Sequence, residues 1–225
     1  MECCFISLLF PPKILNLRIK TSIENFFADL ELYFIKKGWE WVDPEKIGDF
    51  HWRTPDFDIK VISRNADDSI RAIQYGLNIP GVIGLNGKDP IITFSHSFRI
   101  ELPREYPARV DKIRIIADSQ IFHPRFSISG LGEACLQING EIDRILMDMI
   151  FQVLYDPDRV RPPKYYNDAD FGRNSSAMKW YQNNDPKAIY ELLLNKWLDS
   201  RNKKIHPKAK IIEKETKKKG LRIIE

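Results

Sequence analysis

The sequence predicts an α+β fold in which the helices are segregated from an antiparallel sheet. Three observations predict it: apolar residues at helical spacing early in the chain, then four short β-like runs joined by turns, then a second helix with apolar residues at helical spacing. The chain has 225 residues, which is enough to bury a core in one domain with extensions. Its composition is that of an ordinary globular protein.

The first predicted helix covers residues 22–37. Thr21-Ser22-Ile23-Glu24 fits a capping box, in which two side chains pair with free backbone N–H groups at a helix start. Gly38 then fits the left-handed position that commonly ends a helix. The apolar residues that recur at helical spacing are Ile23, Phe26, Phe27, Leu30, Phe34 and Ile35.

Four strands are predicted, over residues 57–62, 70–77, 91–102 and 110–116. Residues 39–55, which precede them, are aromatic and irregular, and such a cluster is more often core than ligand platform. Turn residues join the four runs in sequence order. The sequence therefore predicts a four-stranded antiparallel meander.

The second half of the chain changes character. Residues 118–140 show little periodicity, and long loops inside compact domains are commonly functional. Asn139 is predicted to cap a long central helix, 141–154, whose wide apolar stripe indicates burial. A shorter helix is predicted near residues 174–181. Asp185-Pro186 then supplies a cap and a first-position proline for a last helix.

We divide the chain into an N-terminal arm (1–19), a domain (20–182), a C-terminal helix (183–200) and a basic tail (201–225). The tail has ten Lys and Arg residues against three Glu, so its net charge is +7. Because the whole chain carries +4, the remainder carries −3. A mildly acidic body argues against specific nucleic-acid binding.

Cysteine usage bears on the compartment. The chain has three cysteines, Cys3, Cys4 and Cys135, and this odd number with two adjacent residues does not form a disulfide framework. A reducing cytoplasm is therefore expected. Residues 1–12 lack the basic start of a signal peptide, and no run approaches the about 20 apolar residues of a membrane span. We expect no membrane association, no cofactor and no metal, because the His and Cys residues show no ligand spacing.

Cys135 is the residue with the clearest chemical interest. A lone cysteine is usually a small core residue. Cys135, however, follows Gly130 and Gly132, which can expose a thiol in a loop, and His123 stands twelve residues upstream. Residues 121–136 are therefore a candidate thiol site.

Several motifs occur in order around this loop: Tyr106-Pro107, His123-Pro124, Gly132-Glu133-Ala134-Cys135-Leu136, and a buried helix that ends at Asp156-Pro157. Together, over about residues 20–182, they resemble the ubiquitin-conjugating enzyme (UBC-fold) family. The resemblance implies that family's α+β fold, with an N-terminal helix, a four-stranded meander, an active-site loop and C-terminal helices.

The resemblance also implies a transferase chemistry. Cys135 would accept a ubiquitin-like modifier protein from an activating enzyme as a thioester, and would pass it to an amine, with a ligase where one exists. Cysteine suits this role because a thiolate is a strong nucleophile and a thioester stays reactive towards amines. The resemblance implies that His123 is a brace for the loop more than a base.

The chain departs from the family at several positions. The family's asparagine after His-Pro falls at Arg125, so Arg125 and Asn139 are the two candidates for stabilising the oxyanion. The acidic residue that commonly guards the thiol falls at Arg161, and the phenylalanine used for ligase docking is Ala108. The first helix also lacks the usual basic face. These departures are typical of a divergent member, such as a prokaryotic one, with its own partners.

Two alternatives remain open. A catalytically inactive variant of the fold, acting as a binding module, is favoured by the missing asparagine and acidic residue. An unrelated cysteine hydrolase could use Cys135 with His123, or with His96, as the base. The hydrolase reading is weakened because no acidic or amide side chain stands at a recognisable position to orient the imidazole.

Overall fold

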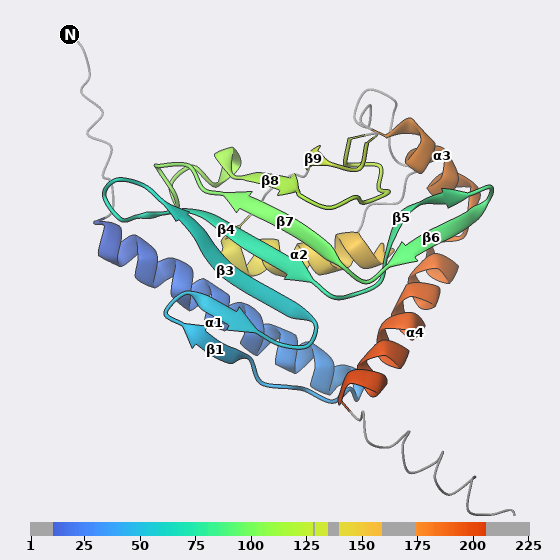
Figure 1. Cartoon of the computed structure of the whole chain (residues 1–225), viewed down its shortest axis with the longest axis horizontal. Helices are drawn as coiled ribbons and strands as arrows, with labels where there is room; N and C mark the ends of the chain where they lie inside the picture. The colour runs from blue at the N-terminus through green and yellow to red at the C-terminus, as the bar shows by residue number, and fades with distance from the viewer. Residues whose placement is uncertain (1–10, 128, 135–139, 159–173, 206–225) are drawn as a thin grey trace, which may run out of the picture.

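The computed structural model describes residues 11–127, 129–134, 140–158 and 174–205. These residues contain the helices α1 (Pro12–Lys37), α2 (Ile142–Leu154), α3 (Ser175–Asn183) and α4 (Pro186–Ile205). They contain the strands β1 (Glu45–Gly48), β2 (His51–Arg53), β3 (Phe57–Arg64), β4 (Ile70–Leu77), β5 (Gly81–Asn86), β6 (Asp89–Thr93), β7 (His96–Glu101), β8 (Arg114–Ala117) and β9 (Gly132–Glu133). The predicted α+β class is confirmed (Figure 1).

Within the described ranges, seven strands form one sheet in the order β1-β2-β3-β4-β7-β8-β9. Every neighbouring pair is antiparallel, and the order follows the sequence except for β5 and β6, which form a separate hairpin. The antiparallel meander is therefore present, with a hairpin inserted between β4 and β7 (Figure 1).

The sheet is larger than the four strands predicted. Residues 39–55, expected to be irregular, contain β1 and β2, and Trp52 of β2 is 3% exposed. Strands of three and four residues are too short to display an alternating pattern, so only pairing defines them, of β1 with β2 and of β2 with β3.

Two predicted strand boundaries are also corrected. The single strand expected over 91–102 is two strands, β6 and β7, which lie in different sheets and are separated at Phe94-Ser95. The strand expected over 110–116 begins only at Arg114, because Val110–Lys112 is a 3₁₀ turn. Apolar periodicity does not mark the point where a chain leaves a sheet, and the register with neighbouring strands decides it.

The first helix begins ten residues earlier than predicted. It starts at Pro12, which occupies a first-turn position where its missing N–H costs nothing, and it ends at Gly38 in the left-handed conformation, as expected. Leu15 and Ile19, assigned to the arm, pack in the same core as Ile23. Packing of this continuous apolar face overrides the local capping box, and Thr21 and the residues after it lie inside the helix.

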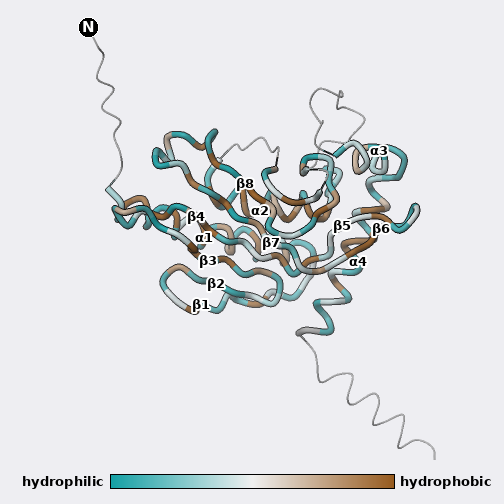
Figure 2. Tube along the Cα trace, turned by 45° about the horizontal axis from the view of Figure 1, so that its top comes forward, coloured by the Kyte–Doolittle hydropathy of each residue, from teal (hydrophilic) through white to brown (hydrophobic). Residues whose placement is uncertain are grey.

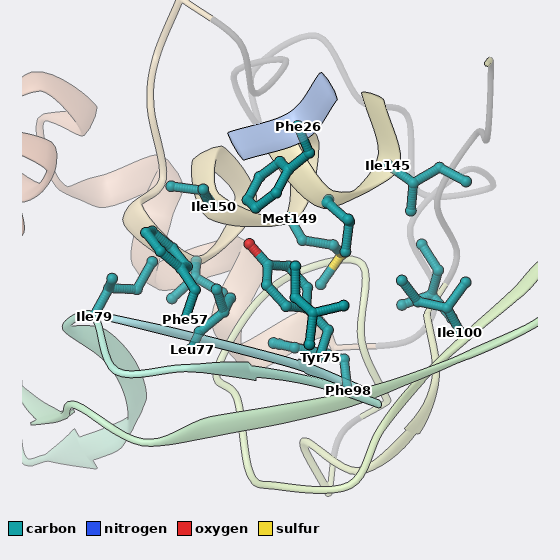
Figure 3. Packing of buried hydrophobic residues seen from close by; sticks show 14 of the residues in the cluster. Phe26, Phe57, Tyr75, Leu77, Ile79, Phe98, Ile100, Ile145, Met149 and Ile150 are labelled. Atoms are coloured by element: carbon teal, nitrogen blue, oxygen red, sulfur yellow. The ribbon is translucent and has the colours of Figure 1, made fainter. Parts of the chain in front are cut away.

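Helices α1 and α2 lie against one face of the large sheet and enclose the core (Figure 1). Figure 3 shows the meeting point, where Phe26 of α1 and Met149 of α2 approach Tyr75 of β4. The ring of Phe26 makes edge contacts with Phe57 and Tyr75, each at 6.0 Å between centroids. Figure 2 shows hydrophobic residues concentrated on the elements that meet here and hydrophilic residues at the outer turns.

Glu141 is the cap residue of α2, which corrects the prediction of Asn139. Its side chain makes no capping bond. It accepts hydrogen bonds instead from Arg18 Nε (3.1 Å) and the hydroxyl of Ser22 (3.3 Å), both on α1. The bond with Arg18 lowers the pKa of Glu141. A carboxylate that could have capped one helix therefore joins two.

The C-terminal helices begin as predicted. Asn174 caps α3 by accepting the N–H of Ala177 (2.9 Å), and Asp185 caps α4 by accepting the N–H of Lys187 (3.0 Å). Helix α4 continues to Ile205, beyond the predicted end near residue 200.

The extension of α4 carries a buried polar contact, which we call the C-terminal anchor: Asp56, Trp197 and Arg201. Asp56 accepts hydrogen bonds from Trp197 Nε1 (3.1 Å) and from the Arg201 guanidinium. All three side chains are buried, and the guanidinium also lies over the ring of Phe34 at 4.3 Å. The anchor joins α4 to the turn before β3 and to the end of α1.

Candidate functional site

The candidate thiol loop is described on both sides of Cys135. Cys135 and Asn139 themselves lie outside the described residues, as does Arg161. Ala134 directly precedes Cys135, and Gly140 directly follows Asn139. The site is therefore built from the backbone that leads to the cysteine and from His123 and Arg125.

The backbone before Cys135 is held in the sheet. Strand β9 pairs with β8 at the edge of the sheet, with Glu133 opposite Ile116. The N–H of Ala134 then donates to the carbonyl of Ile115 at 2.8 Å. The chain is thus fixed in register up to the residue that precedes the cysteine.

Gly130 closes the loop that precedes β9. Its carbonyl accepts the N–H of Ile121 (3.1 Å), so the loop returns on itself. Gly130 has a φ of +72°, and an added Cβ would lie 2.7 Å from the carbonyl oxygen of Ile121. Only glycine fits there without displacement of the backbone, because both the positive φ and the close approach exclude a side chain.

Other elements hold the same loop from outside. The N–H of Phe122 donates to the carbonyl of Val82 in β5 at 2.7 Å. The hydroxyl of Tyr181 in α3 donates to the carbonyl of Phe122 at 3.3 Å. The β5–β6 hairpin and α3, neither of which belongs to the large sheet, therefore position the His-Pro segment.

His123 is buried among aromatic rings. It is 2% exposed, and its ring centroid lies 5.7 Å from Phe126, 5.5 Å from Tyr155 and 6.2 Å from Tyr181. We call these four residues the His123 cluster. Burial, with a smaller contribution from the positive charge of Arg125, lowers the pKa of His123 to about 3. The imidazole is therefore neutral at physiological pH.

The hydrogen bonding of His123 assigns its tautomer. Its Nδ1 accepts the backbone N–H of Arg125 at 3.1 Å, so in the neutral ring the proton is on Nε2. Within the described residues, Nε2 is buried and has no hydrogen-bond partner. An imidazole whose one acceptor nitrogen already holds the turn has no lone pair left to take a proton. This geometry suits a bracing residue and not a general base.

Arg125 contributes its backbone to the turn and its charge to the surroundings of His123. The side chain is partly buried. Its positive charge adds to the effect of burial in lowering the pKa of His123. The structure thus brings together His123 and Arg125, two of the four predicted site residues.

Two tyrosines of the His123 cluster are absent from the sequence-based prediction. Tyr155, at the end of α2, stacks on Tyr181 of α3 with centroids 3.7 Å apart and planes 16° apart. Tyr155 has a φ of +56°, a conformation rare for a side chain this large. Its position before Asp156-Pro157 marks a helix end, but nothing in the sequence pairs it with Tyr181.

A ladder of exposed charges also approaches the loop. Arg114 of β8 lies between Glu101 of β7 (3.1 Å) and Glu133 of β9 (3.3 Å). Glu133 precedes Cys135 by two residues, so this ladder ends beside the candidate site. Its members face solvent, and each pair is of the kind that contributes little to stability.

His96, the alternative base, lies in the core. It is 2% exposed, and a Cβ added at Gly81 would meet its Nε2 at 2.6 Å and a methyl of Val153 at 2.8 Å. Burial lowers the pKa of His96 to about 4. The close contact with β5 and α2 gives it a packing role between these elements.

No protein-family model matches the sequence, and no curated protein matches it at a significant level. Among the described residues, no three His, Cys, Asp or Glu side chains gather as metal ligands. None of the helices in the described part of the chain is both long and apolar enough to cross a membrane.

Proposed function

We propose that the chain is a ubiquitin-conjugating-like transferase that carries a ubiquitin-like protein as a thioester on Cys135. The observation that carries the proposal is the backbone before the cysteine. It is fixed to the sheet edge by the Ala134–Ile115 bond, and the loop that leads to it contains the buried His123. Nucleophilic catalysis requires a well-positioned nucleophile, and a backbone that is held in register up to Ala134 supports this role for Cys135.

The proposed chemistry is two acyl transfers. The Cys135 thiolate attacks the thioester carbonyl between an activating enzyme and the C-terminal glycine of the modifier, and the thiolate of the activating enzyme leaves. A substrate amine then attacks the new thioester, loses a proton, and releases the Cys135 thiolate. No cofactor takes part, and a ligase acts only where the second step needs one.

The residues around the thiol take supporting roles in this proposal. His123 holds the turn through Arg125, which its lowered pKa and engaged Nδ1 support. Arg125 and Asn139 remain the two candidates for stabilising the oxyanion. Thiol chemistry of this kind needs reduced cysteine, so the proposal includes a cytoplasmic setting.

The test uses the full chain with its cognate activating enzyme, ATP and modifier. A Cys135→Ser variant should form an oxyester that survives a thiol reductant, whereas the wild-type adduct should be released. Cys135→Ala should form no adduct, and a Cys3→Ser/Cys4→Ser variant should behave as wild type. A reductant-sensitive adduct on Cys135→Ala would overturn the assignment.

Thiol reactivity separates the proposal from the inactive binding module. The proposal predicts that Cys135 reacts with iodoacetamide in the folded protein, as an accessible thiolate does. A thiol that reacts only after denaturation would favour the binding module. The experiment is best run on the Cys3→Ser/Cys4→Ser variant, so that Cys135 is the single thiol.

A further inference from the structure

Helix α1 is apolar on two opposite faces. One face carries the core residues, and the other carries Ile14, Leu17, Leu32 and Ile35, which are 53%, 62%, 65% and 59% exposed. At about 100° per residue these four side chains fall within an arc of about 60° on the side opposite the core. Exposed apolar side chains that gather on one face in this way commonly mark an interaction surface.

The side chains follow a particular order along this exposed face, and a partner surface must be complementary to that order. We call it the outer stripe: Ile14, Leu17, Thr21, Ala28, Leu32 and Ile35. All six residues are exposed. The stripe is palindromic about the midpoint of the helix, between residues 24 and 25. Isoleucine stands at both ends, leucine next on both sides, and a small residue nearest the middle on both sides.

A second copy of the same helix matches this order when it runs antiparallel. Ile14 then meets Ile35 of the partner subunit, Leu17 meets Leu32 of the partner subunit, and the small residues lie at the crossing point. A two-fold symmetric interface requires such a self-complementary surface. The small central residues allow the two helices to approach closely.

The charges beside the stripe select the same direction. Lys20 and Glu31 lie on one flank. Asp29 lies on the other flank with Arg18, whose guanidinium also binds Glu141 of its own chain. In an antiparallel pair, side chains of the same flank face each other, so each base lies within about 3 Å along the axis of an acid of the partner subunit. In a parallel pair opposite flanks meet, and base would face base and acid face acid.

We propose that two copies of this chain associate through the outer stripe as an antiparallel α1–α1 pair, with the two-fold axis between residues 24 and 25. Glu24 of each copy lies near this axis and has its own counter-ion, because Lys46 is 3.9 Å from it. One helix face is smaller than the about 800 Å² per partner of a standard interface. The dimer is therefore weak and dependent on concentration.

The experiment measures the mass of the full chain by sedimentation velocity with a reductant present, from about 5 to about 500 μM. The wild type should shift from monomer to dimer over this range. Leu17→Glu/Leu32→Glu places like charges opposite each other at both ends and should remain monomeric. Leu17→Lys/Leu32→Glu places opposite charges there and should retain the dimer, but only if the pair is antiparallel.

Three controls test whether the change in mass is specific to the outer stripe. Ile62→Glu changes an exposed apolar side chain on β3 and should leave the dimer unchanged. Removal of residues 1–10 should also leave it unchanged, and a lost dimer would place the contact in that segment. The stripe variants should keep the wild-type melting temperature, because the side chains they replace are exposed.

Several outcomes would overturn the proposal. One is a wild type that stays monomeric at every concentration. Another is a dimer that persists in Leu17→Glu/Leu32→Glu. A third is a monomeric wild type that co-sediments with anionic phospholipid vesicles, since the stripe would then face a membrane surface. None of these outcomes depends on Cys135, so the proposed transferase activity is tested separately.

Discussion

The C-terminal anchor and the His123 cluster are two buried polar sites with opposite hydrogen-bond states. In the anchor, the carboxylate of Asp56 accepts from both Trp197 and Arg201. In the cluster, Nε2 of His123 is buried without a partner among the described residues. The anchor satisfies its charges and joins two parts of the fold, whereas the cluster keeps an imidazole neutral within the candidate thiol loop.

The two sites differ in what their buried polar groups do: those of the anchor stabilise the fold, and those of the cluster belong to the candidate site. A buried ion pair whose hydrogen bonds are made is costly to break, because one charge is then left alone in the interior. A buried donor without a partner lowers stability, and natural proteins retain such groups mostly where a site requires them. We therefore expect changes in the anchor to affect unfolding at any pH, and changes around His123 to affect the proposed acyl transfer and the pH dependence of unfolding.

The largest expected effect is that of Arg201→Ala. It leaves Asp56 buried without its counter-ion, and the free energy of unfolding should fall by about 3–5 kcal/mol. Urea denaturation measures the loss. The matched control is Arg53→Ala, which removes an exposed partner of Asp58 and should cost less than about 1 kcal/mol. Equal losses of unfolding free energy in the two variants would contradict the claim that the buried ion pair matters more to stability than the exposed one.

The second effect is a pH dependence that originates in His123. Its folded-state pKa of about 3 lies below the unfolded value of about 6.5, so the unfolded state binds the proton first as pH falls. Stability is fully present above pH 6.5 and is lost towards pH 3, with a loss of about 2 kcal/mol at pH 5. Between pH 8 and pH 5, His123→Gln should therefore lose about 2 kcal/mol less stability than the wild type.

Urea denaturation of both proteins at the two pH values provides the measurement. His96 is present in both proteins and contributes equally, so it cancels in the difference. The same decline in His123→Gln as in the wild type would show that His123 is not held neutral by burial, and would contradict its place in the cluster.

The third effect is a loss of stability at Gly130, which closes the candidate thiol loop. Gly130→Ala should cost about 1–2 kcal/mol for the left-handed backbone alone. The contact at 2.7 Å with the Ile121 carbonyl should add to this cost and should slow thioester formation on Cys135. Gly87→Ala is the control, because Gly87 has a similar φ of +63° with no atom within 4 Å. If the two variants lost equal amounts of unfolding free energy, the loop would have moved to accommodate the added Cβ at Gly130.

The smallest expected effect is in the exposed ladder beside the loop. Arg114→Ala breaks two ion pairs, but the side chain is 53% exposed, so the loss should stay below about 1 kcal/mol. Added salt should reduce the difference from wild type, since surface pairs are screened. A loss that is larger, or indifferent to salt, would mean that the ladder belongs with the buried sites.

The sequence predicted the elements that have strong local signals. The last two helices begin directly after Asn174 and Asp185, near the predicted positions, and Asp185 accepts a backbone N–H as the predicted cap. The ends of α1 and α2 were likewise marked by Gly38 and by the residues before Pro157. Caps and turns depend on neighbours in the chain, so composition and spacing are sufficient to predict them.

Predictions failed where distant segments decide the outcome. The start of α1 depends on Leu15 and Ile19 reaching a core built by strands far along the chain, and that packing outweighs a capping box. The short strands β1 and β9 exist only through their register with β2 and β8. For the candidate site, the sequence singled out His123 and Arg125 but not the tyrosines around the imidazole.

By itself, the sequence determined the α+β class and the order of the main elements, and it singled out the segment that contains Cys135 as the candidate site. Tertiary structure alone decided that His123 is buried and neutral, that Tyr155 stacks on Tyr181, and that Asp56 pairs with Arg201. The physical reason is that burial and pairing depend on which surfaces meet across the fold, while periodicity and capping act within a few residues.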